Sequence, residues 1–138
     1  MTQTQSESFF QTGIRVLDAL TASGKQIVFM KDIPDLNFNI LSCFDMTPFK
    51  DHVIRHNCYM NYSDYLERNK SFDSMLLKLT SRYPSLKVYS PTDLFCYTTT
   101  DVCVAKENTE PLYFNSDHLT RKGSDLVIAD LLRQYVID

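Results

Sequence analysis

Apolar residues near the start of the chain recur at the three- and four-residue spacing of one helix face. The positions that follow this pattern are Phe9, Phe10, Ile14, Leu17 and Leu20. We expect Ser6 or Ser8 to cap the helix at its N-terminus and Gly24 to end it. Residues 26–30 contain the continuous apolar run Ile-Val-Phe-Met, which has strand length. Such a run predicts a parallel strand in the middle of a sheet, covered on both faces.

Beyond Pro34 the pattern weakens and then returns. Residues 35–61 show little sustained periodicity, so we expect a long loop there, with at most a short helix near residues 49–55. A second amphipathic helix is predicted to begin at Ser63 and to end before Pro84. Its apolar stripe comprises Tyr62, Tyr65, Leu66, Phe72, Leu76, Leu79 and Tyr83.

Shorter elements complete the pattern. A strand at Leu86–Tyr89 follows the second helix, and strand, helix and strand together predict a right-handed parallel βαβ unit. Residues 107–111 read as a polar turn, and Thr120 as the N-cap of a final helix. Gly123, in the first turn of that helix, allows a close approach to another backbone. The residues that this helix is expected to bury are Val127, Ile128, Leu131, Leu132 and Tyr135.

The composition indicates an ordinary soluble domain. The chain has 138 residues, of which 43% are apolar and 22% charged, which is enough for a single core. A formal net charge of −3 and the lack of a Lys/Arg cluster argue against a nucleic-acid partner. No apolar run approaches the roughly 20 residues that a membrane-spanning helix needs. Residues 1–8 lack the basic and apolar segments of a signal peptide, so on this evidence alone the chain stays in the cytosol.

The four cysteines indicate a different compartment. Cys96 and Cys103 bracket a short loop that a disulfide closes without strain, and Cys43 and Cys58 lie in the long loop. Of the three possible connectivities, 43 to 58 with 96 to 103 is the most local, and we predict it. Disulfides persist in oxidising compartments, so this pairing favours a location outside the cytosol. The alternative is a cytosolic protein whose four thiols are all free.

Two other groups of residues suggest binding chemistry. His52 and His56 stand four residues apart and, with Cys43 and Cys58, provide the donor types of a zinc site. Their spacing matches no standard zinc module, so we predict neither a metal nor another cofactor. The aromatic cluster at residues 59–65 has ring faces that suit sugar stacking, but its helical spacing favours a place in the core.

The residues just before the final helix carry the strongest chemical signal. His118 precedes the helix start, in a loop of the kind that gathers ligands at the carboxyl ends of parallel strands. A neutral imidazole beside a polar residue accepts a proton from a hydroxyl group and returns it to a leaving group, which is general-base catalysis of acyl transfer. The alternative is that His118 only satisfies a backbone carbonyl at the junction of loop and helix.

Residues 112–120 read Leu-Tyr-Phe-Asn-Ser-Asp-His-Leu-Thr and are followed by Gly123 and an apolar helix. They resemble the last signature block of SGNH (GDSL-type) hydrolases, Asp-x-x-His-Leu-Ser/Thr-x-x-Gly. The similarity is strongest to the SGNH domains fused behind the acyltransferase-3 domain of bacterial O-acyltransferases. Residues 24–34 resemble that group's strand and its Pro turn, and Asp93–Cys96 with Cys103 resemble its cysteine-bearing segment.

The resemblance implies an α/β fold of the three-layer, flavodoxin-like kind with a short parallel sheet. It also implies that residues 1–138 are the C-terminal portion of a single SGNH domain, because the family's first strand and Gly-Asp-Ser nucleophile block have no counterpart in this sequence. The Gly and Asn of the family's oxyanion hole have no clear counterpart either. We therefore expect the chain to be part of a longer membrane protein, on its periplasmic or extracytoplasmic face.

By the same resemblance, the domain transfers acyl groups, commonly acetyl, to cell-surface carbohydrate. Its partners are then a carbohydrate acceptor and an acyl donor from a membrane acyltransferase domain. His118 takes the place of the family's general base, and Asn115 stands where the family has the Asp that orients the imidazole. Asp117 is the alternative orienting residue, although its position next to His118 requires an unusual bend of the loop.

Two other functions stay open from the sequence. One is a non-catalytic remnant or carbohydrate-interaction module that keeps the fold without the chemistry. The other is a complete small esterase that uses Ser42, Ser63 or Ser90, although none of these has the Gly-Asp context of the family's nucleophile. For the isolated chain we expect no more than trace esterase activity, because a triad without its nucleophile retains only binding contributions.

Overall fold

The structure, a computed structural model, describes residues 3–44 and 57–135. These residues form helices together with short parallel and antiparallel strands, so the predicted α/β class is confirmed. The chain folds into two compact units: unit 1 comprises residues 1–31 and 66–89, and unit 2 comprises residues 32–65 and 90–138. The three-layer arrangement and the assignment to a single domain stay predictions.

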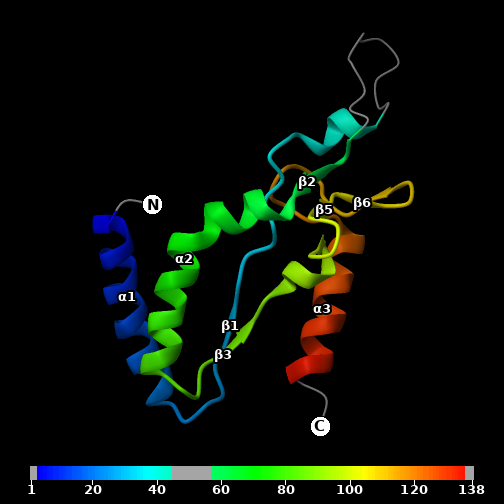
Figure 1. The fold of residues 1–138 in the computed structure, drawn as a ribbon. Helices are drawn as coiled ribbons and strands as arrows, with labels where there is room; N and C mark the ends of the chain where they lie inside the picture. The colour runs from blue at the N-terminus through cyan, green and yellow to red at the C-terminus, as the bar shows by residue number, and fades with distance from the viewer. Residues whose placement is uncertain (1–2, 45–56, 136–138) are drawn as a thin grey trace. The chain divides into compact units, whose positions relative to one another are not determined.

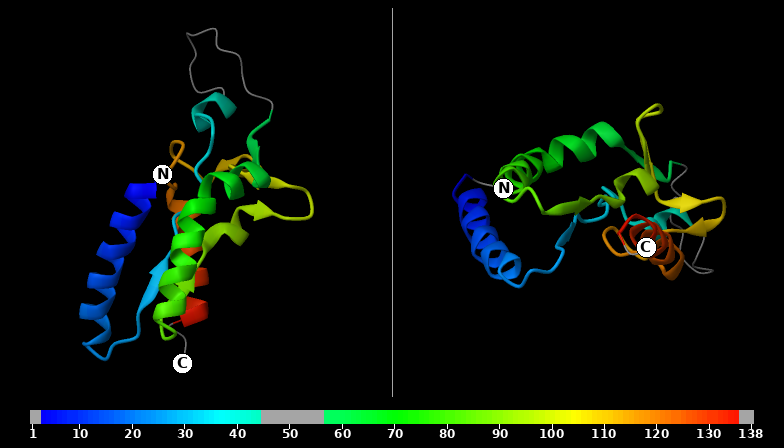
Figure 2. Two further views of the ribbon diagram at one scale, coloured as in Figure 1. Left: turned by 60° about the vertical axis from the view of Figure 1, so that its left-hand side comes forward. Right: turned by 90° about the horizontal axis from the view of Figure 1, so that it is seen from below.

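Unit 1 contains the strand, helix and strand that the sequence predicts. Helix α1 (Gln3–Thr21) precedes strand β1 (Val28–Met30), and the long helix α2 (Tyr62–Arg82) precedes strand β3 (Lys87–Tyr89). Strands β1 and β3 pair in parallel over their whole length, which confirms the predicted pairing. From Leu66 on, α2 lies beside α1 in this unit (Figures 1 and 2).

Apolar side chains from both helices form the core of unit 1. The buried cluster consists of Leu17, Met75, Leu79, Tyr83 and Leu86, with Phe10, Ile14, Ile27, Phe29 and Phe72 packed against it. The helices approach closely at Gly13, where a Cβ atom would come within 3.2 Å of a Leu79 methyl carbon. The Tyr83 hydroxyl donates to Asp18 Oδ1 at 2.6 Å, so the polar end of this ring is satisfied.

Some details of unit 1 differ from the predictions. Helix α1 already begins at Gln3, so Ser6 and Ser8 lie inside it and neither is its cap; glutamine is a good helix former and extends the helix toward the N-terminus. Gly24 does follow the helix end, with a φ of 69° that favours glycine. Among the described residues β1 pairs with β3 alone, and its Met30 is exposed. The predicted central, fully covered position is therefore not seen within the described residues, because an apolar run alone does not determine a strand's place in a sheet.

Besides helical segments, unit 2 contains short antiparallel strands. Strands β2 (Tyr59–Asn61), β4 (Cys96–Tyr97) and β5 (Val102–Val104) form a sheet in the order β2-β5-β4. Strands β6 (Lys106–Glu107) and β7 (Glu110–Pro111) form a hairpin at the place of the predicted polar turn. Such short strands share few backbone hydrogen bonds, so other links have to stabilise this unit.

Two disulfide bonds provide such links, and both are the predicted ones. Cys43, the last residue of the short 3-10 helix η1 (Ile40–Cys43), is bonded to Cys58. Cys96 is bonded to Cys103, the residue directly opposite it in the pairing of β4 with β5. Both bonds lie within unit 2, so they cross-link the part of the chain with the least regular structure.

The bond between Cys43 and Cys58 also bears on the alternative zinc site. It removes both thiols from the set of metal ligands, because a disulfide sulfur is no thiolate. His52 and His56 lie outside the described residues, as does the short helix expected near residues 49–55.

The aromatic cluster at residues 59–65, which was expected in the core, belongs to the core of unit 2 only in part. Met60 and Tyr65 are buried, and the rings of Tyr62 and Tyr65 stack with their centroids 6.1 Å apart. Tyr59 is exposed, because successive residues of β2 point to opposite faces of the sheet.

Helix α3 (Arg121–Tyr135) begins as predicted. Thr120 is its cap: the Gly123 N–H donates to Thr120 Oγ1 at 3.3 Å, and the Ser124 N–H donates to the Thr120 carbonyl oxygen at 2.9 Å. A Cβ atom at Gly123 would collide with the carbonyl oxygen of Leu112. The predicted close approach of this helix to another backbone is therefore confirmed.

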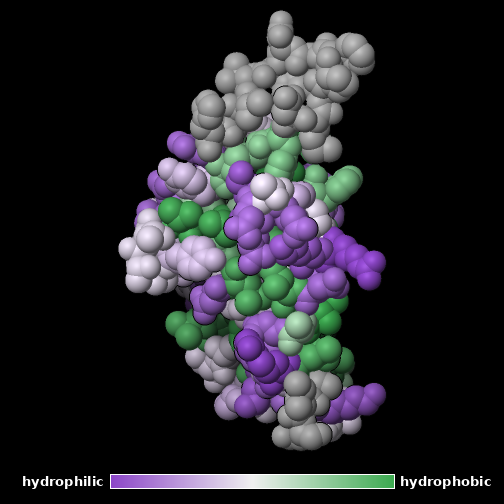
Figure 3. All heavy atoms as spheres, turned by 90° about the vertical axis from the view of Figure 1, so that its right-hand side faces the viewer, coloured by the Kyte–Doolittle hydropathy of each residue, from purple (hydrophilic) through white to green (hydrophobic). Residues whose placement is uncertain are grey.

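The buried face of α3 is narrower than the apolar pattern predicts. Gly123, Val127 and Asp130 are buried, whereas Ile128 is 52% exposed and Leu132 is also exposed. The close contact at Gly123 turns the stripe at positions i, i+4 and i+7 inward, and residues 128 and 132 lie outside that stripe. Figure 3, which views the side of the molecule where α3 lies, shows hydrophobic and hydrophilic residues interspersed. The prediction that Ile128 and Leu132 are buried was wrong.

Candidate active site

Residues 113–119 form a tight antiparallel turn just before α3. Tyr113 pairs with Leu119, and the Phe114 N–H donates to the His118 carbonyl oxygen at 2.7 Å. Directly opposite residues of an antiparallel pair project to the same face. Accordingly, Tyr113 is buried and Leu119 half-buried, and the next pair, Phe114 and His118, is exposed. The turn therefore presents the imidazole to solvent on a hydrogen-bonded backbone.

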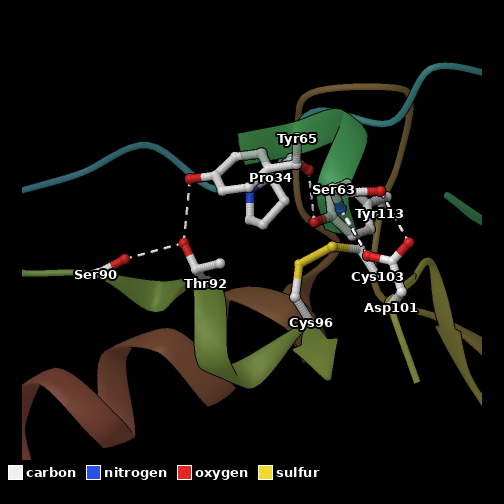
Figure 4. The surroundings of a disulfide bond; sticks show 9 residues. All are labelled: Pro34, Ser63, Tyr65, Ser90, Thr92, Cys96, Asp101, Cys103 and Tyr113. Carbon is white, nitrogen blue, oxygen red and sulfur yellow. Dashed lines mark hydrogen bonds between the residues drawn. A yellow bond between two sulfur atoms is a disulfide. The ribbon is translucent and has the colours of Figure 1, made fainter. Parts of the chain in front are cut away.

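Two hydrogen bonds anchor this turn to the segment that follows β1 in the chain. The Leu36 N–H donates to the Ser116 carbonyl oxygen at 2.7 Å. The Tyr113 hydroxyl donates to the Pro34 carbonyl oxygen at 2.8 Å (Figure 4). Burial raises the pKa of Tyr113, so the phenol stays neutral and keeps the proton that it donates. The position of the turn thus depends on residues about 80 positions earlier in the sequence.

Aromatic packing and a disulfide support the turn from the core of unit 2. The Tyr113 ring meets the Phe95 ring edge-on, with centroids 5.5 Å apart, and both side chains are buried. Phe95 directly precedes Cys96, whose bond to Cys103 lies near Tyr113 and Pro34 in Figure 4. The turn is therefore supported by buried, cross-linked residues.

Two side-chain oxygens meet the Nδ1 atom of His118. Asn115 Oδ1 and Asp117 Oδ1 each lie 3.1 Å from this nitrogen. Asn115 Oδ1 also accepts the backbone N–H of Asp117 at 3.0 Å and that of His118 at 2.7 Å. One amide oxygen thus bends the backbone and contacts the imidazole at the same time.

These contacts determine which nitrogen of the neutral imidazole carries the proton. The Asn115 atom that faces two backbone N–H groups must be an acceptor, so the amide carbonyl oxygen, and not the NH2 group, lies beside Nδ1. The Asp117 carboxylate is an acceptor as well. Nδ1 therefore donates, and Nε2 keeps the lone pair that a general base needs. The His118 side chain is 72% exposed, so an incoming hydroxyl group has access to it.

The family model that matches this chain is that of the SGNH domain (fused to AT3 domains), and the match covers residues 2–133. The chain belongs to the SGNH family. The resemblance seen in the sequence is confirmed, and this SGNH chain is a hydrolase-like module of a kind associated with acyltransferases. Comparison with curated proteins found no match, and comparison with solved structures found none either.

The family's fusion to AT3 domains gives the SGNH module the context of a membrane acyltransferase. Within residues 3–44 and 57–135, none of the helices combines the length and apolar character that crossing a bilayer requires. The two disulfide bonds favour an oxidising compartment and therefore an extracytoplasmic location.

In this SGNH module both candidate orienting residues reach the imidazole. Asn115, which stands where the family has Asp, contacts Nδ1 through its amide oxygen. Asp117 contacts the same nitrogen, so the loop has the unusual bend that this alternative required. Asn115 imposes this bend on residues 115–118 by accepting two backbone N–H groups. Asp117 adds the negative charge that the amide of Asn115 lacks.

The three serines considered as nucleophiles of a small esterase are not brought to His118. Each hydroxyl donates to another group of unit 2, and none of these acceptors is an imidazole. The bonds are Ser42 Oγ to the Asn39 carbonyl oxygen at 2.6 Å, Ser63 Oγ to Asp101 Oδ2 at 2.8 Å and Ser90 Oγ to Thr92 Oγ1 at 2.9 Å. A serine nucleophile needs a base within hydrogen-bond reach, so the geometry does not support these three.

The contacts that support the turn were not predicted from the sequence. An Asn followed by polar residues is typical of an Asx turn, and this signal could have predicted the contacts of Asn115 with the backbone. No local signal predicts the bond between Tyr113 and Pro34, because the two residues are 79 positions apart in sequence.

Proposed function

We propose that this SGNH module takes part in acyl transfer to cell-surface carbohydrate, commonly O-acetylation, on the periplasmic or extracytoplasmic face of a longer membrane acyltransferase. The observation that carries the proposal is the contact of His118 Nδ1 with Asn115 and Asp117, which leaves Nε2 as an exposed base. The nucleophile is a serine of a Gly-Asp-Ser block supplied from outside these 138 residues, which contain no such block. The partners are the acyl donor of the membrane domain and the acceptor sugar.

In this mechanism His118 moves one proton in each half-reaction. Nε2 removes the proton of the serine hydroxyl while the serine oxygen attacks the carbonyl carbon of the acyl donor. The imidazolium then gives this proton to the departing group of the donor, and an acyl-serine remains. In the second half, a sugar hydroxyl gives its proton to Nε2 and attacks the acyl-serine. The acyl group passes to the sugar oxygen, and the serine oxygen takes the proton back.

Asn115 and Asp117 have different parts in this scheme. The imidazole becomes positively charged in each half-reaction, and the Asp117 carboxylate at 3.1 Å stabilises that charge. Both groups are exposed, so water screens this interaction and its effect is modest. Asn115 carries no charge, and its oxygen holds Nδ1 in the donor state because two backbone N–H groups fix the amide.

Exposed apolar surface on unit 1 supports the view that further polypeptide completes the domain. The groove between α1 and β1 has a volume of about 290 Å³. On either side of β1, the Ile27 carbonyl oxygen accepts the Lys87 N–H and the Lys31 N–H donates to the Tyr89 carbonyl oxygen, so the backbone groups of Val28 and Met30 point away from β3. An added strand would pair with these groups. Apolar side chains of α1 that are about half exposed there are Phe9, Val16 and Leu20.

The test uses a longer protein that supplies the Gly-Asp-Ser serine, assayed for acyl transfer to carbohydrate. We expect His118→Ala to lower kcat by about 10² to 10⁴-fold, the usual contribution of a general acid–base group. Asn115→Asp keeps the acceptor oxygen and adds a charge beside the imidazolium, so we expect it to raise activity. Ser116→Ala is the control in the same turn: it removes only a long contact of the serine hydroxyl with Asp117 Oδ1 at 3.5 Å, so activity should change little.

The possible results separate the three functions. An enzyme indifferent to His118→Ala would show that this residue is structural and would favour the non-catalytic module. In the isolated chain, hydrolysis of p-nitrophenyl acetate that is lost on replacing Ser42, Ser63 or Ser90 would favour the small esterase. Loss of activity in His118→Ala without a gain in Asn115→Asp would identify Asp117 as the orienting residue that matters.

A further inference from the structure

A small apolar pocket of about 120 Å³ opens beside the turn that carries His118. Two hydroxyl groups line it, and both already donate elsewhere: Thr120 Oγ1 to the Pro111 carbonyl oxygen at 2.9 Å, and the Tyr113 hydroxyl to Pro34. The pocket therefore offers a hydrocarbon surface to a ligand. Its apolar lining comprises Ile40, Leu41, Phe44, Pro111 and Phe114.

The rim of this pocket exposes large apolar side chains to water. Phe114 is 71% exposed and Leu41 is 50% exposed. The Phe44 ring is covered on one side by Lys106, whose Nζ atom lies 5.8 Å from the ring centroid. Exposed apolar side chains around a concave site favour a ligand that removes them from water.

Phe114 joins the lining of the pocket to the turn that carries the base. Phe114 is the residue opposite His118, and the Phe114 N–H bonds to the His118 carbonyl oxygen at 2.7 Å. Both side chains are exposed and project to one face, because directly opposite residues do so. A carbonyl group that reacts near Nε2 therefore has an apolar surface next to it for its substituent.

We propose that this pocket receives the hydrocarbon part of the acyl group during transfer, an inference that rests on the function proposed above. Its volume is about four times the roughly 30 Å³ that one water molecule occupies in the liquid, so it holds a chain of about four carbon atoms. A sugar ring is the less suitable occupant, because its hydroxyl groups would be desolvated against a mostly apolar lining whose two hydroxyl groups already donate their protons elsewhere. The pocket thus selects short acyl chains.

Binding is measured on the 138-residue chain with both disulfides formed, by following its NMR signals during titration with simple esters. The probes are methyl acetate, methyl propionate, methyl butyrate, methyl octanoate and methyl β-glucoside. We expect the esters to shift the signals of Leu41, Phe44 and Phe114. The Kd should fall about fourfold for each methylene added from acetate to butyrate, and then level off once the pocket is full.

Variants show whether the shifts come from this pocket. Phe114→Ala and Leu41→Ala should each weaken methyl butyrate binding, and both positions are exposed enough for the fold to tolerate the change. Leu77→Ala is the matched control, because Leu77 is 67% exposed on α2 and does not line the pocket. His118→Ala should keep methyl butyrate binding. Retained binding in this variant, together with unchanged transfer activity, would refute the role of His118 as the base of the proposed function and leave the pocket assignment standing.

Other results would overturn the pocket assignment. If methyl β-glucoside shifts the Phe114 signals and the esters do not, the surface binds a sugar ring and not an acyl chain. Equal affinity for methyl acetate and methyl butyrate, or butyrate binding unaffected by Phe114→Ala and Leu41→Ala, would also contradict it. In either case the role of His118 in transfer would be judged separately, by the kcat of His118→Ala.

Discussion

Unit 1 packs two helices against a pair of parallel strands, whereas unit 2 combines strands of two or three residues with one α-helix and two disulfide bonds. In unit 1, long amphipathic elements supply the core cluster around Leu17 and Leu79. In unit 2, individual hydrogen bonds such as the one from the Tyr113 hydroxyl to the Pro34 carbonyl oxygen take the place of extended backbone hydrogen-bond ladders. The candidate active site lies in unit 2, so its geometry depends on a few identifiable bonds.

This difference explains how the candidate catalytic side chain of His118 can be held without regular structure around it. Asn115 and Asp117 lie in a turn, and loops carry functional residues well only when a scaffold positions them. Here the scaffold is the buried Tyr113 ring, the Phe95 ring and the disulfide that follows Phe95 in the chain. Disturbing unit 2 should therefore affect the site more than disturbing unit 1 does.

Among the changes that test this difference between the units, reduction of both disulfide bonds should have the largest effect. The bridged cysteines are 15 and 7 positions apart, and bridges of such lengths stabilise by about 3 and 2.5 kcal/mol in the chain-entropy model. Hydrogen exchange should show a large loss of amide protection in unit 2 and a smaller one in unit 1. An equal loss in both units would show that the chain unfolds as one cooperative domain.

The converse test is Leu79→Ala, which removes a fully buried side chain from the core of unit 1. We expect it to cost about 3 kcal/mol, from lost burial and the cavity left behind. Leu77→Ala, two positions earlier on α2 and 67% exposed, is the control and should change stability by less than about 0.5 kcal/mol. Urea unfolding gives both values. The signals of the His118 turn should be unchanged in folded Leu79→Ala, and a shift there would contradict the distinction between the units.

A pair of helical glycines provides the next comparison. Gly123→Ala places a Cβ atom against the backbone oxygen of Leu112, so α3 must move and we expect a loss of about 2 kcal/mol. Gly13→Ala meets only a flexible Leu79 methyl group at 3.2 Å and gains helix propensity, so it should be close to neutral. Urea unfolding of the two variants checks this order. A Gly123→Ala protein as stable as Gly13→Ala would show that the contact of α3 with Leu112 is not tight.

The smallest effect concerns Lys122, which pairs with Glu107 at 2.6 Å and with Glu110 at 2.5 Å. Hydrogen bonding to Lys122 lowers the pKa of the Glu110 carboxyl. A carboxyl with a lowered folded-state pKa stabilises the fold above its unfolded-state pKa, and this stabilisation is lost as the pH falls through the folded-state pKa. Lys122→Met should therefore reduce the loss of stability on acidification.

Thermal unfolding between neutral and acidic pH measures this dependence in the wild type and in Lys122→Met. Lys70→Met is the control, because it removes only the exposed pair with Glu67 at 3.5 Å. The same acid dependence in wild type and Lys122→Met would show that the contact between Lys122 and Glu110 contributes nothing to the pH dependence of stability.

The sequence predicted unit 1 better than unit 2, and the reason is physical. Helix α2 was expected to begin at Ser63 and begins at Tyr62. The prediction was close because a long helix has many apolar positions that all fit the helical period. Strand β2 was not predicted, since three residues are too few to establish alternation. In unit 2 the local spacing of the cysteines predicted both disulfides.

At the candidate site, sequence reasoning identified the residues but not their contacts. His118 and Asn115 followed from the family motif, whereas the contact of Asp117 with Nδ1 depends on the bend that Asn115 produces. The bond from Tyr113 to Pro34 joins segments far apart in sequence, so no local pattern could reveal it. Tertiary hydrogen bonds decide the geometry here.

The most direct test of the account is the tautomer of His118, which long-range ¹H–¹⁵N NMR reads in the 138-residue chain without any nucleophile. At alkaline pH, where imidazole groups are neutral, we predict that the proton resides on Nδ1 and that Nε2 is unprotonated. Replacing both Asn115 and Asp117 by Ala should remove this preference, whereas Ser116→Ala should keep it. A wild-type His118 protonated on Nε2 would contradict the account, because the atom assigned as the base would then have no lone pair to accept a proton.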